Sequence, residues 1–483
     1  MNVLFVTSEC APFIKTGGLA DVLGALPQAL ADRGASVRVA MPLYGSIGDP
    51  WRSQMKFIRY EYISLAWRSL YCGLFELERD GVVYWFLDNE YYFKRGEIYG
   101  HFDDAERFAF FSKAVTDLLP QLDWTPDVVH SNDWETALVP LYIRRAHAGD
   151  VFYDGIRTVF TIHNIEYQGR YGADLMGDIF ALPPELLHDG TLRYGKDISL
   201  LKGAIECSDW VTTVSPTYAG ELQYPFYAHG MEKVVERNRG KITGILNGID
   251  TRLYDPMHDP NLVRQYNTTN IADRVYNKLD LQQILGLNQD ESIPLIAMVG
   301  RLVRHKGLDL VASALDAIMD MPVQFVVLGR GDWHFEQLFQ NAQNNYAGRL
   351  SASIMVNFGL SMKIFGGADI FLMPSRAEPC GLTQMMALRY GAVPVVRETG
   401  GLRDTVSPYI AESGEGSGFT FANYDAGDMT YVLRQAVETY ADRDAWTALQ
   451  KRGMALRFDW AAPAGEYLSL YGKLTGKDET VDS

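Results

Sequence analysis

Cysteine is scarce in this sequence. The chain has 483 residues and only four cysteines, and no two of them have the spacing of a metal-binding pair; they are Cys10, Cys72, Cys207 and Cys380. So few cysteines in so long a chain exclude the disulfide framework that small secreted domains use. We therefore expect all four to be free thiols.

Long apolar runs and an excess of positive charge are also missing. No segment approaches the roughly 18 uninterrupted apolar residues of a membrane-spanning helix, although 47% of the residues are hydrophobic. Acidic residues outnumber basic ones by 60 to 44, and the net charge of −16 argues against nonspecific binding to nucleic acid or to an anionic membrane. Because an apolar strand follows the first methionine directly, no signal peptide is expected, and the sequence predicts a soluble, cytoplasmic protein.

Apolar runs of strand length alternate with helical patterns along the chain. A chain of this length exceeds what one hydrophobic core can serve. In the first half, the runs lie at 3–6, 37–41, 127–130, 158–162 and 211–214. In the second half they lie at 295–299, 324–328, 353–357, 370–373, 393–396 and 419–421, and helices are predicted at 432–456 and 463–474. This alternation predicts an α/β protein with two Rossmann-like, doubly wound domains.

The predicted domain boundaries follow from these patterns. Asn247-Gly248, a turn-forming pair, lies where the pattern restarts. We predict a first domain at 1–245 with an antiparallel insertion at about 44–100, a second domain at 246–456, a helix at 457–474 that packs back on the first domain, and a polar tail at 475–483. The insertion is rich in aromatic residues, which could stack on sugar rings or fill a small core of its own; the second interpretation is favoured.

The run Lys-Thr-Gly-Gly-Leu-Ala-Asp-Val at 15–22 lies between the first strand and a helical pattern. Glycine lets the backbone approach a ligand closely, and the first turn of a helix offers free N–H groups. Lys15 adds a positive charge, so Lys15, Gly17 and Gly18 form a candidate phosphate site. A turn that merely needs glycine is the alternative.

The second half carries a similar combination. Arg301 follows a predicted strand and Lys306 comes five residues later, so both cations could converge on a diphosphate. Further on, Glu378 to Thr383 joins a strand end to a helical pattern, and the glutamate could accept hydrogen bonds from sugar hydroxyls. A basic surface cluster at 304–306 and a glutamate that only begins a helix are the alternatives.

Six motifs in the same order resemble those of bacterial glycogen synthases and plant starch synthases. They are Lys-Thr-Gly-Gly-Leu-Ala-Asp-Val at 15–22, Thr-Ile-His-Asn-Ile-Glu-Tyr-Gln-Gly at 161–169, Val-Ser-Pro-Thr-Tyr at 214–218, Asn-Gly-Ile-Asp at 247–250, Gly-Arg-Leu at 300–302 and Pro-Ser-Arg-Ala-Glu-Pro-Cys-Gly-Leu-Thr-Gln at 374–384. The resemblance covers nearly the whole chain. It implies the glycosyltransferase-B architecture, in which two Rossmann-like domains face a central cleft, and glucosyl transfer from ADP-glucose to the non-reducing end of an α-1,4-glucan with retention.

The resemblance also assigns the donor site. It places Lys15, Gly17 and Gly18 at the donor diphosphate and the neighbouring sugar, and Arg301 and Lys306 on the phosphates of the leaving ADP. It implies neither a metal nor another cofactor, so these cations would neutralise the leaving group. The Asp-x-Asp match at 442–444 is interpreted as a solvated charge run rather than a metal site.

The remaining assignments concern the transferred glucose. Glu378 matches the carboxylate that faces this sugar, and Cys380, Gly381, Leu382 and Thr383 match the loop beside it. His163 matches the histidine next to the anomeric carbon, and Asp133 matches a cleft aspartate.

Two other functions stay open at this point. A related retaining glycosyltransferase with another nucleotide sugar or acceptor would share the architecture. A noncatalytic glucan-binding protein would explain the aromatic residues, but it has no need for Lys15, Arg301 and Lys306.

Overall fold

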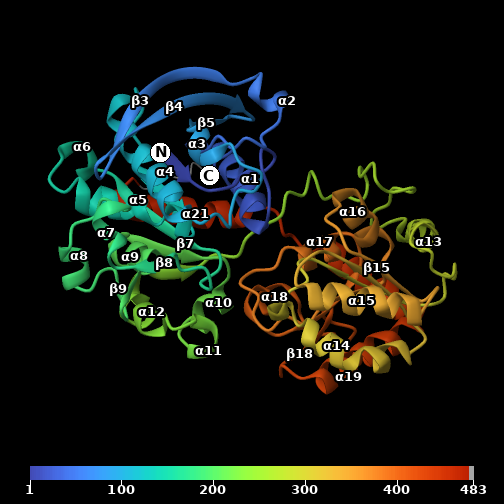
Figure 1. Ribbon diagram of the computed structural model, residues 1–483. Helices are drawn as coiled ribbons and strands as arrows, with labels where there is room; N and C mark the ends of the chain where they lie inside the picture. The colour runs from blue at the N-terminus through green and yellow to red at the C-terminus, as the bar shows by residue number, and fades with distance from the viewer. Residues whose placement is uncertain (478–483) are drawn as a thin grey trace. The chain divides into compact units, whose positions relative to one another are not determined.

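The computed structural model describes residues 1–477, so most of the predicted tail at 475–483 lies outside the described residues. The chain divides into two compact units (Figure 1). Unit 1 comprises Met1–Gly248 and the C-terminal segment from Trp460, and unit 2 comprises Ile249–Asp459. Among the described residues, no helix is both long and apolar enough to cross a bilayer. All four cysteines are free thiols, as predicted.

Within the described part of unit 1, nine strands form one sheet in the order β12-β11-β7-β6-β1-β2-β5-β4-β3. Their bounds are β1 Asn2–Val6, β2 Ser36–Pro42, β3 Lys56–Leu65, β4 Arg68–Arg79, β5 Val82–Asp88, β6 Val128–Asn132, β7 Arg157–Ile162, β11 Trp210–Thr213 and β12 Ile242–Gly244. The strands from β12 to β5 run parallel. Val3 to Val6 of β1 are fully buried, as expected for a strand covered on both faces.

The helices of unit 1 connect these strands. They are α1 Gly18–Ala31, α2 Asp49–Arg52, α3 Glu90–Phe93, α4 Asp104–Leu118, α5 Leu138–Leu141, α6 Val151–Asp154, α7 Leu175–Asp178, α8 Glu185–His188, α9 Leu200–Cys207, α10 Pro216–Glu221, α11 Pro225–Ala228, α12 Glu232–Asn238 and α21 Ala461–Thr475. A small sheet of β8 Arg170–Gly172, β10 Asp197–Ser199 and β9 Arg193–Tyr194 lies between α5 and α9 in the sequence. Ser215 caps α10 by accepting a hydrogen bond from Tyr218 N, with Pro216 in the first turn.

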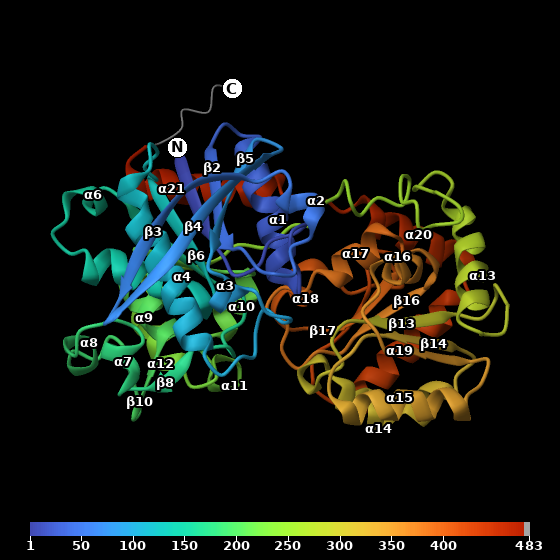
Figure 2. The ribbon, with the colours of Figure 1, turned by 45° about the horizontal axis from the view of Figure 1, so that its top comes forward.

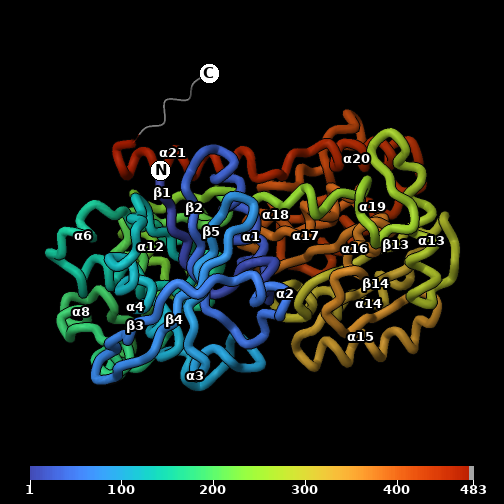
Figure 3. The backbone as a smooth tube through the Cα atoms, turned by 90° about the horizontal axis from the view of Figure 1, so that it is seen from above, coloured from blue at the N-terminus to red at the C-terminus, as the bar shows by residue number. Residues whose placement is uncertain are grey.

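Helix α21 returns to unit 1 at the end of the chain. It packs against α1 and lies close to the N-terminus in Figures 2 and 3. Its Tyr471 hydroxyl lies 2.6 Å from Nδ1 of His130 in β6, and Lys477 forms an ion pair with Asp127 at 2.6 Å. These contacts tie the C-terminal helix to the centre of the sheet.

The aromatic insertion consists of antiparallel strands that belong to the main sheet. Strand β5 pairs in parallel with β2, and β4 and β3 follow as antiparallel neighbours, so the insertion extends the main sheet (Figure 2). The reason lies in β5, where Phe86 and Leu87 point to opposite faces and both are buried. A turn at Asp80-Gly81 joins β4 to β5, with positive φ angles of 52° and 77° at these residues.

Within residues 249–459, six strands form a parallel sheet in the order β15-β14-β13-β16-β17-β18. Their bounds are β13 Leu295–Val299, β14 Gln324–Leu328, β15 Leu350–Ser353, β16 Ile370–Met373, β17 Val393–Arg397 and β18 Phe419–Phe421. The helices are α13 Arg274–Ile284, α14 Leu308–Met319, α15 Trp333–Asn345, α16 Phe358–Gly367, α17 Thr383–Arg389, α18 Gly400–Thr405, α19 Ala426–Tyr440 and α20 Arg443–Ala455.

Helices cover both faces of this sheet, which confirms the predicted doubly wound fold. Helix α14 packs against α15 and α19, and α16 packs against α13 and α17 (Figure 1). Along β13, Ile296 and Met298 join the core under α14, α15 and α19. On the other face, Phe371 of β16 lies 5.5 Å from Phe365 of α16, measured between ring centroids.

Two predicted elements of unit 2 are wrong in their bounds. The strand predicted at 353–357 is β15 at Leu350–Ser353, because Asn357 accepts a hydrogen bond from Leu360 N and caps α16. The apolar residues that suggested a longer strand, Met355 and Val356, are exposed. The helix predicted at 432–456 is broken between α19 and α20, where Asp442 caps the second helix.

Candidate functional site

The predicted site residues divide between the two units. Lys15, Gly17, Gly18, Asp133 and His163 lie in unit 1, and Arg301, Lys306, Glu378 and residues 380–383 lie in unit 2. In both units they follow the carboxyl ends of parallel strands, which is where open α/β sheets bind ligands.

The two glycines of the β1–α1 loop, Gly17 and Gly18, have backbone conformations that other residues also adopt. Gly17 has φ −152° and ψ −166°, extended values that any residue adopts, and Gly18 begins α1 with a negative φ. The glycine that packing requires is Gly24, because a Cβ there would lie 2.8 Å from the carbonyl oxygen of Ala11. Gly24 therefore lets α1 pack closely on the loop.

The carboxylates of Glu9 and Asp21 bind the N–H groups and the lysine of this loop. Glu9, which sequence reasoning did not select, accepts hydrogen bonds from Thr16 N at 2.5 Å and Gly17 N at 3.3 Å. Lys15 forms an ion pair with Asp21 at 2.6 Å, and the Lys15 side chain is 42% exposed. Burial raises the pKa of Glu9, and the bonds from Thr16 partly oppose this shift. The Glu9 carboxylate thus shapes the loop, while the Lys15 ammonium stays accessible.

Asp133 fixes the backbone that carries His163. Its Oδ1 accepts hydrogen bonds from His163 N at 2.8 Å and Asn164 N at 3.4 Å. Its own backbone has φ 56°, a conformation that non-glycine residues rarely adopt. Burial raises the pKa of Asp133 to about 7, these two hydrogen bonds lower it, and the Glu9 carboxylate adds to the rise. The Asp133 side chain therefore holds the backbone of His163 and Asn164, and its raised pKa lets it carry a proton near neutral pH.

A third carboxyl group, that of Glu135, lies near Asp133. Glu135 is buried, and among residues 1–477 its Oε2 atom has no hydrogen-bond partner. Burial and, to a smaller degree, the charge of Asp133 raise the pKa of Glu135. No sequence signal separated Glu135 from the other acidic residues near the strand ends.

The His163 ring is held by Asn132, a residue that was not predicted for the site. His163 Nε2 lies 2.9 Å from Asn132 Oδ1, and the Asn132 amide nitrogen donates to Val6 O at 3.1 Å. Burial lowers the pKa of His163 to about 3, so the ring is neutral at pH 7. A neutral ring that donates from Nε2 has its lone pair on Nδ1. His163 can therefore shape or polarise a site, but it is not charged there.

In unit 2 the structure brings together Lys306 and Glu378. Lys306 Nζ lies 2.9 and 2.6 Å from the two carboxylate oxygens of Glu378, and Ser375 Oγ donates to the same carboxylate at 3.0 Å. The Glu378 side chain is 6% exposed and that of Lys306 is 27% exposed. Arg301 lies just beyond β13 and is exposed. The contact argues against a surface cluster for Lys306, whereas Arg304 does lie at the surface.

Glycines without room for a side chain hold the Glu378 loop in place. Gly307 has φ 79°, and a Cβ there would overlap the carbonyl oxygen of Pro374. Gly400 has φ 45°, and a Cβ there would overlap the carbonyl oxygen of Glu378. Gly401 N donates to this same oxygen at 3.2 Å. The loop that carries Glu378 is thus clamped by backbone contacts that only glycine permits.

This clamp predicts a large difference between two glycine substitutions. Gly400→Ala combines backbone strain with a clash and should lower the free energy of unfolding by about 3 kcal/mol or more. Gly414→Ala is the matched control, since Gly414 has φ 72° with no atom near its Cβ position, and strain alone should cost about 1 kcal/mol. Urea unfolding measures both, and equal losses would contradict the clamp.

The loop at 380–383 is shaped by Gln384. The Gln384 side-chain nitrogen donates to Cys380 O at 3.1 Å, Gly381 O at 2.9 Å and Thr405 Oγ1 at 3.1 Å. Gly381 has φ 70°. Gln384 is buried, so its side-chain amide fixes the loop from the protein interior. Gly381 to Thr383 stay partly exposed.

The Asp-x-Asp match has a structural role. Asp442 Oδ1 accepts a hydrogen bond from Ala445 N at 3.1 Å and caps α20. Across residues 1–477, no three His, Cys, Asp or Glu side chains are placed to hold one metal ion.

Comparison with known proteins finds two matching families of glycosyl transferases. Residues 2–237 match the family described as the starch synthase catalytic domain, and residues 281–452 match glycosyl transferases group 1. The chain is 45% identical to the glycogen synthase of Anoxybacillus flavithermus over 98% of both chains. It is 44% identical to that of Geobacillus stearothermophilus over 99% of both chains.

Solved structures agree with these sequence relations. The catalytic domain of starch synthase IV from Arabidopsis thaliana, bound to ADP and acarbose, matches with a TM-score of 0.91 and 32% identity, over 98% of this chain and 99% of that one. The sucrose-phosphate synthase of Thermosynechococcus elongatus matches with a TM-score of 0.62 over 99% and 100% of the two chains. At 17% identity this second likeness shows the fold alone.

Proposed function

This chain belongs to the family of bacterial glycogen synthases and plant starch synthases. From that premise we propose which of its residues bind the donor and which act on the transferred glucose. The predicted family resemblance and the predicted glycosyltransferase-B fold are both confirmed. The chain is a glycosyltransferase that extends an α-glucan from a nucleotide sugar. We propose ADP-glucose as the donor and the non-reducing end of an α-1,4-glucan as the acceptor.

The observation that supports this proposal best is the Lys306–Glu378 pair. A buried carboxylate held by a lysine and a serine is suited to accept hydrogen bonds from sugar hydroxyls. Lys306 keeps 27% of its side chain exposed, so it can also meet a phosphate. With Arg301 it would neutralise the charge that develops on the departing diphosphate, since each cation near a surface contributes up to about 4 kcal/mol before desolvation.

In unit 1, Lys15 would break its ion pair with Asp21 and bind the donor diphosphate. Gly17 and Gly18 would lie beside the diphosphate and the neighbouring sugar. His163, with its neutral ring, would lie beside the anomeric carbon. Asp133 would act as a positioning residue, because its contacts are to the backbone of His163 and Asn164.

The proposed reaction exchanges one bond at the anomeric carbon. The C1–O bond to the β-phosphate breaks, and ADP leaves with the electron pair. The 4-hydroxyl of the acceptor forms the new C1–O bond on the same face, and its proton passes to the leaving phosphate. Retention follows because bond formation and departure share one face of the sugar.

A donor assay tests the proposal. The protein is mixed with glycogen and either ADP-glucose or UDP-glucose, and both nucleoside diphosphate release and glucan elongation are measured. We expect elongation with ADP-glucose and the loss of most diphosphate release when glycogen is omitted. Elongation with UDP-glucose but not with ADP-glucose would refute the donor assignment. Diphosphate release without elongation would refute transfer to a glucan.

A further inference from the structure

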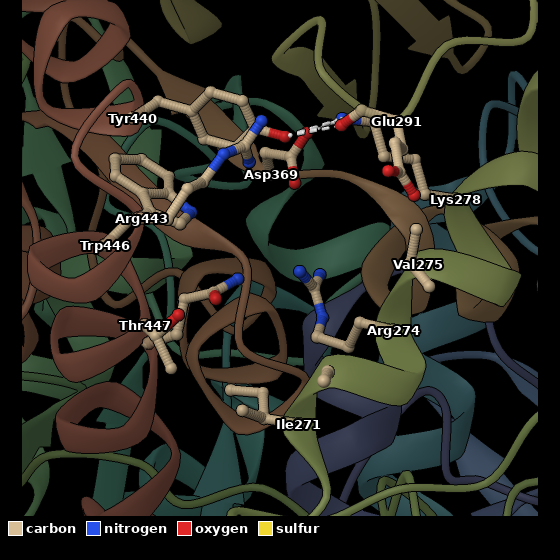
Figure 4. Close-up of a pocket in the computed structure, with 12 residues that line it drawn as sticks. Ile271, Arg274, Val275, Lys278, Glu291, Asp369, Tyr440, Arg443, Trp446 and Thr447 are labelled. Carbon is tan, nitrogen blue, oxygen red and sulfur yellow. Dashed lines mark hydrogen bonds and ion pairs between the residues drawn. The ribbon is translucent and has the colours of Figure 1, made fainter.

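A cavity lined by both charged and apolar residues lies within unit 2, away from the proposed donor residues. It has a volume of about 160 Å³ and is lined by residues of α13, α19 and α20 together with Glu291 and Asp369 (Figure 4). Asp369 directly precedes β16, so the cavity lies at the amino edge of the sheet. Arg301 and Glu378 follow the carboxyl ends of strands, at the opposite edge, and a strand of five residues spans roughly 16 Å.

Arg274 supplies the cavity with a buried positive charge that no carboxylate of residues 1–477 pairs with directly. Its residue is 6% exposed, and Figure 4 shows its guanidinium group pointing into the cavity. Within residues 1–477, its hydrogen bonds go to uncharged oxygens, namely Ala368 O at 2.5 Å, Phe365 O at 3.2 Å and the Tyr266 hydroxyl at 3.4 Å. A buried cation without a counter-ion is costly, and a bound anion would compensate it.

Trp446 supplies a hydrogen-bond donor that lacks an acceptor. The residue is 2% exposed and lines the cavity, and among the described residues its indole N–H has no hydrogen-bond partner. An indole nitrogen only donates, so the group that satisfies it must be an acceptor.

Two helix N-termini add to the positive potential. Helix α13 begins at Arg274 and α20 begins at Arg443, and both residues line the cavity. The dipole of a helix favours an anion near its N-terminus, although in α20 the Asp442 side chain already accepts a hydrogen bond from Ala445 N. Arg443, which is exposed, lies over the ring of Tyr440 at 3.9 Å and adds a second arginine at the cavity.

Two acidic residues line the cavity, Asp369 and Glu291. Asp369 forms an ion pair with Lys278 at 2.7 Å and accepts a hydrogen bond from Leu295 N at 2.9 Å. Glu291 contributes its backbone oxygen to Lys278 and Tyr440, and the residue is exposed. Arg274, Lys278 and Arg443 thus outnumber the two acidic residues by one, which leaves one excess positive charge at the cavity in a chain whose net charge is −16.

We propose that this cavity binds a small phosphate-type oxyanion, either inorganic phosphate or the phosphoryl group of a small metabolite. Its volume equals that of about five water molecules, which admits a tetrahedral oxyanion with a short substituent. Arg274, Arg443 and the Trp446 indole N–H bind the anion. The site is separate from the donor phosphate site and does not depend on the proposed function.

The indole N–H of Trp446 allows a direct test by NMR. The chain has nine tryptophans, and Trp446→Phe identifies the Trp446 indole signal by its loss. The full-length protein is titrated with inorganic phosphate, with glycerol 3-phosphate and, at matched ionic strength, with chloride. We expect the Trp446 signal to shift saturably with one or both phosphates and not with chloride; the compound that binds more tightly identifies the source of the oxyanion.

Variants complete the test. Arg443→Met should weaken phosphate binding about tenfold, because it removes a charged donor, whereas Arg434→Met, at an exposed arginine of α19, should not. The Trp460 indole is a matched control, since it is also buried and, among the described residues, also lacks a hydrogen-bond partner, but it lies outside the cavity. Its signal should not move. Lys306→Ala should leave the Trp446 shift intact even where it abolishes ADP binding. No shift at about 20 mM phosphate, or unchanged affinity in Arg443→Met, would overturn the proposal.

Discussion

Lys306→Ala is expected to lower the turnover number of glucosyl transfer by about 10²- to 10³-fold, the usual effect of removing one preorganised electrostatic group. The reason is that Lys306 holds the Glu378 carboxylate at 2.6 Å and, in the proposed reaction, faces the charge of the leaving diphosphate. Steady-state kinetics with ADP-glucose and glycogen measures the loss.

The same substitution should also destabilise unit 2. Removing one partner of a buried ion pair costs about 3–5 kcal/mol, and partial exposure of Lys306 reduces this to about 1–3 kcal/mol. Adding Glu378→Gln removes the stranded charge, so the double variant should recover most of the stability. It should not recover turnover, because both groups that act on the donor are then gone.

Arg304→Ala provides the matched control for Lys306→Ala. Arg304 lies in the same 3₁₀ helix, its side chain is 73% exposed, and it pairs with Asp309 at 3.6 Å. Its loss should change turnover less than about threefold, as expected for a surface ion pair. Near-normal turnover in Lys306→Ala, or turnover that returns together with stability in the double variant, would remove Lys306 from the proposed mechanism.

His163→Ala is expected to reduce glucosyl transfer by about 10²-fold or more while ADP affinity stays within a few-fold of the parent. In the proposed reaction this side chain lies beside the anomeric carbon, where charge develops, and does not contact the nucleotide. Because burial lowers the pKa of His163 to about 3, the ring stays neutral from pH 6 to 8. The loss should therefore be the same across this pH range.

Asn132→Ala separates the position of the His163 ring from its presence. It removes the acceptor at 2.9 Å from Nε2 but keeps the imidazole, so a smaller loss, of about tenfold in turnover, is expected. Calorimetry with ADP and kinetics from pH 6 to 8 measure these effects. Equal losses of ADP affinity and turnover in His163→Ala would place the residue in nucleotide binding or folding instead.

Much of the fold follows from local patterns. The strands at 295–299, 324–328 and 370–373 were predicted with their observed bounds, because an apolar strand in a parallel sheet is buried on both faces and is visible as a short continuous run. The prediction failed at 353–357, where Asn357 starts a helix and overrides the apolar residues before it. Nothing in the sequence indicated that the insertion joins the main sheet, since the pairing of β2 with β5 connects segments far apart in sequence.

In the candidate site, too, the sequence predicted single residues but not the contacts between them. Motifs selected Lys15, Asp133, His163, Lys306 and Glu378 as single residues. No motif indicated that Lys306 and Glu378, 72 positions apart, form one ion pair. Glu9 and Asn132 could have been considered because they lie at the carboxyl ends of β1 and β6, but nothing in the sequence shows that they hold the Gly17 loop and the His163 ring.

The sequence by itself determined the fold class, the family and the residues with chemistry to offer, because apolar periodicity and motif order are properties of neighbouring positions. Only the tertiary structure decided which carboxylate pairs with which cation, which histidine is neutral, and which glycines admit no side chain. These outcomes depend on burial and on distances between segments remote in sequence, where loss of water makes electrostatic contacts strong and close packing leaves no spare volume.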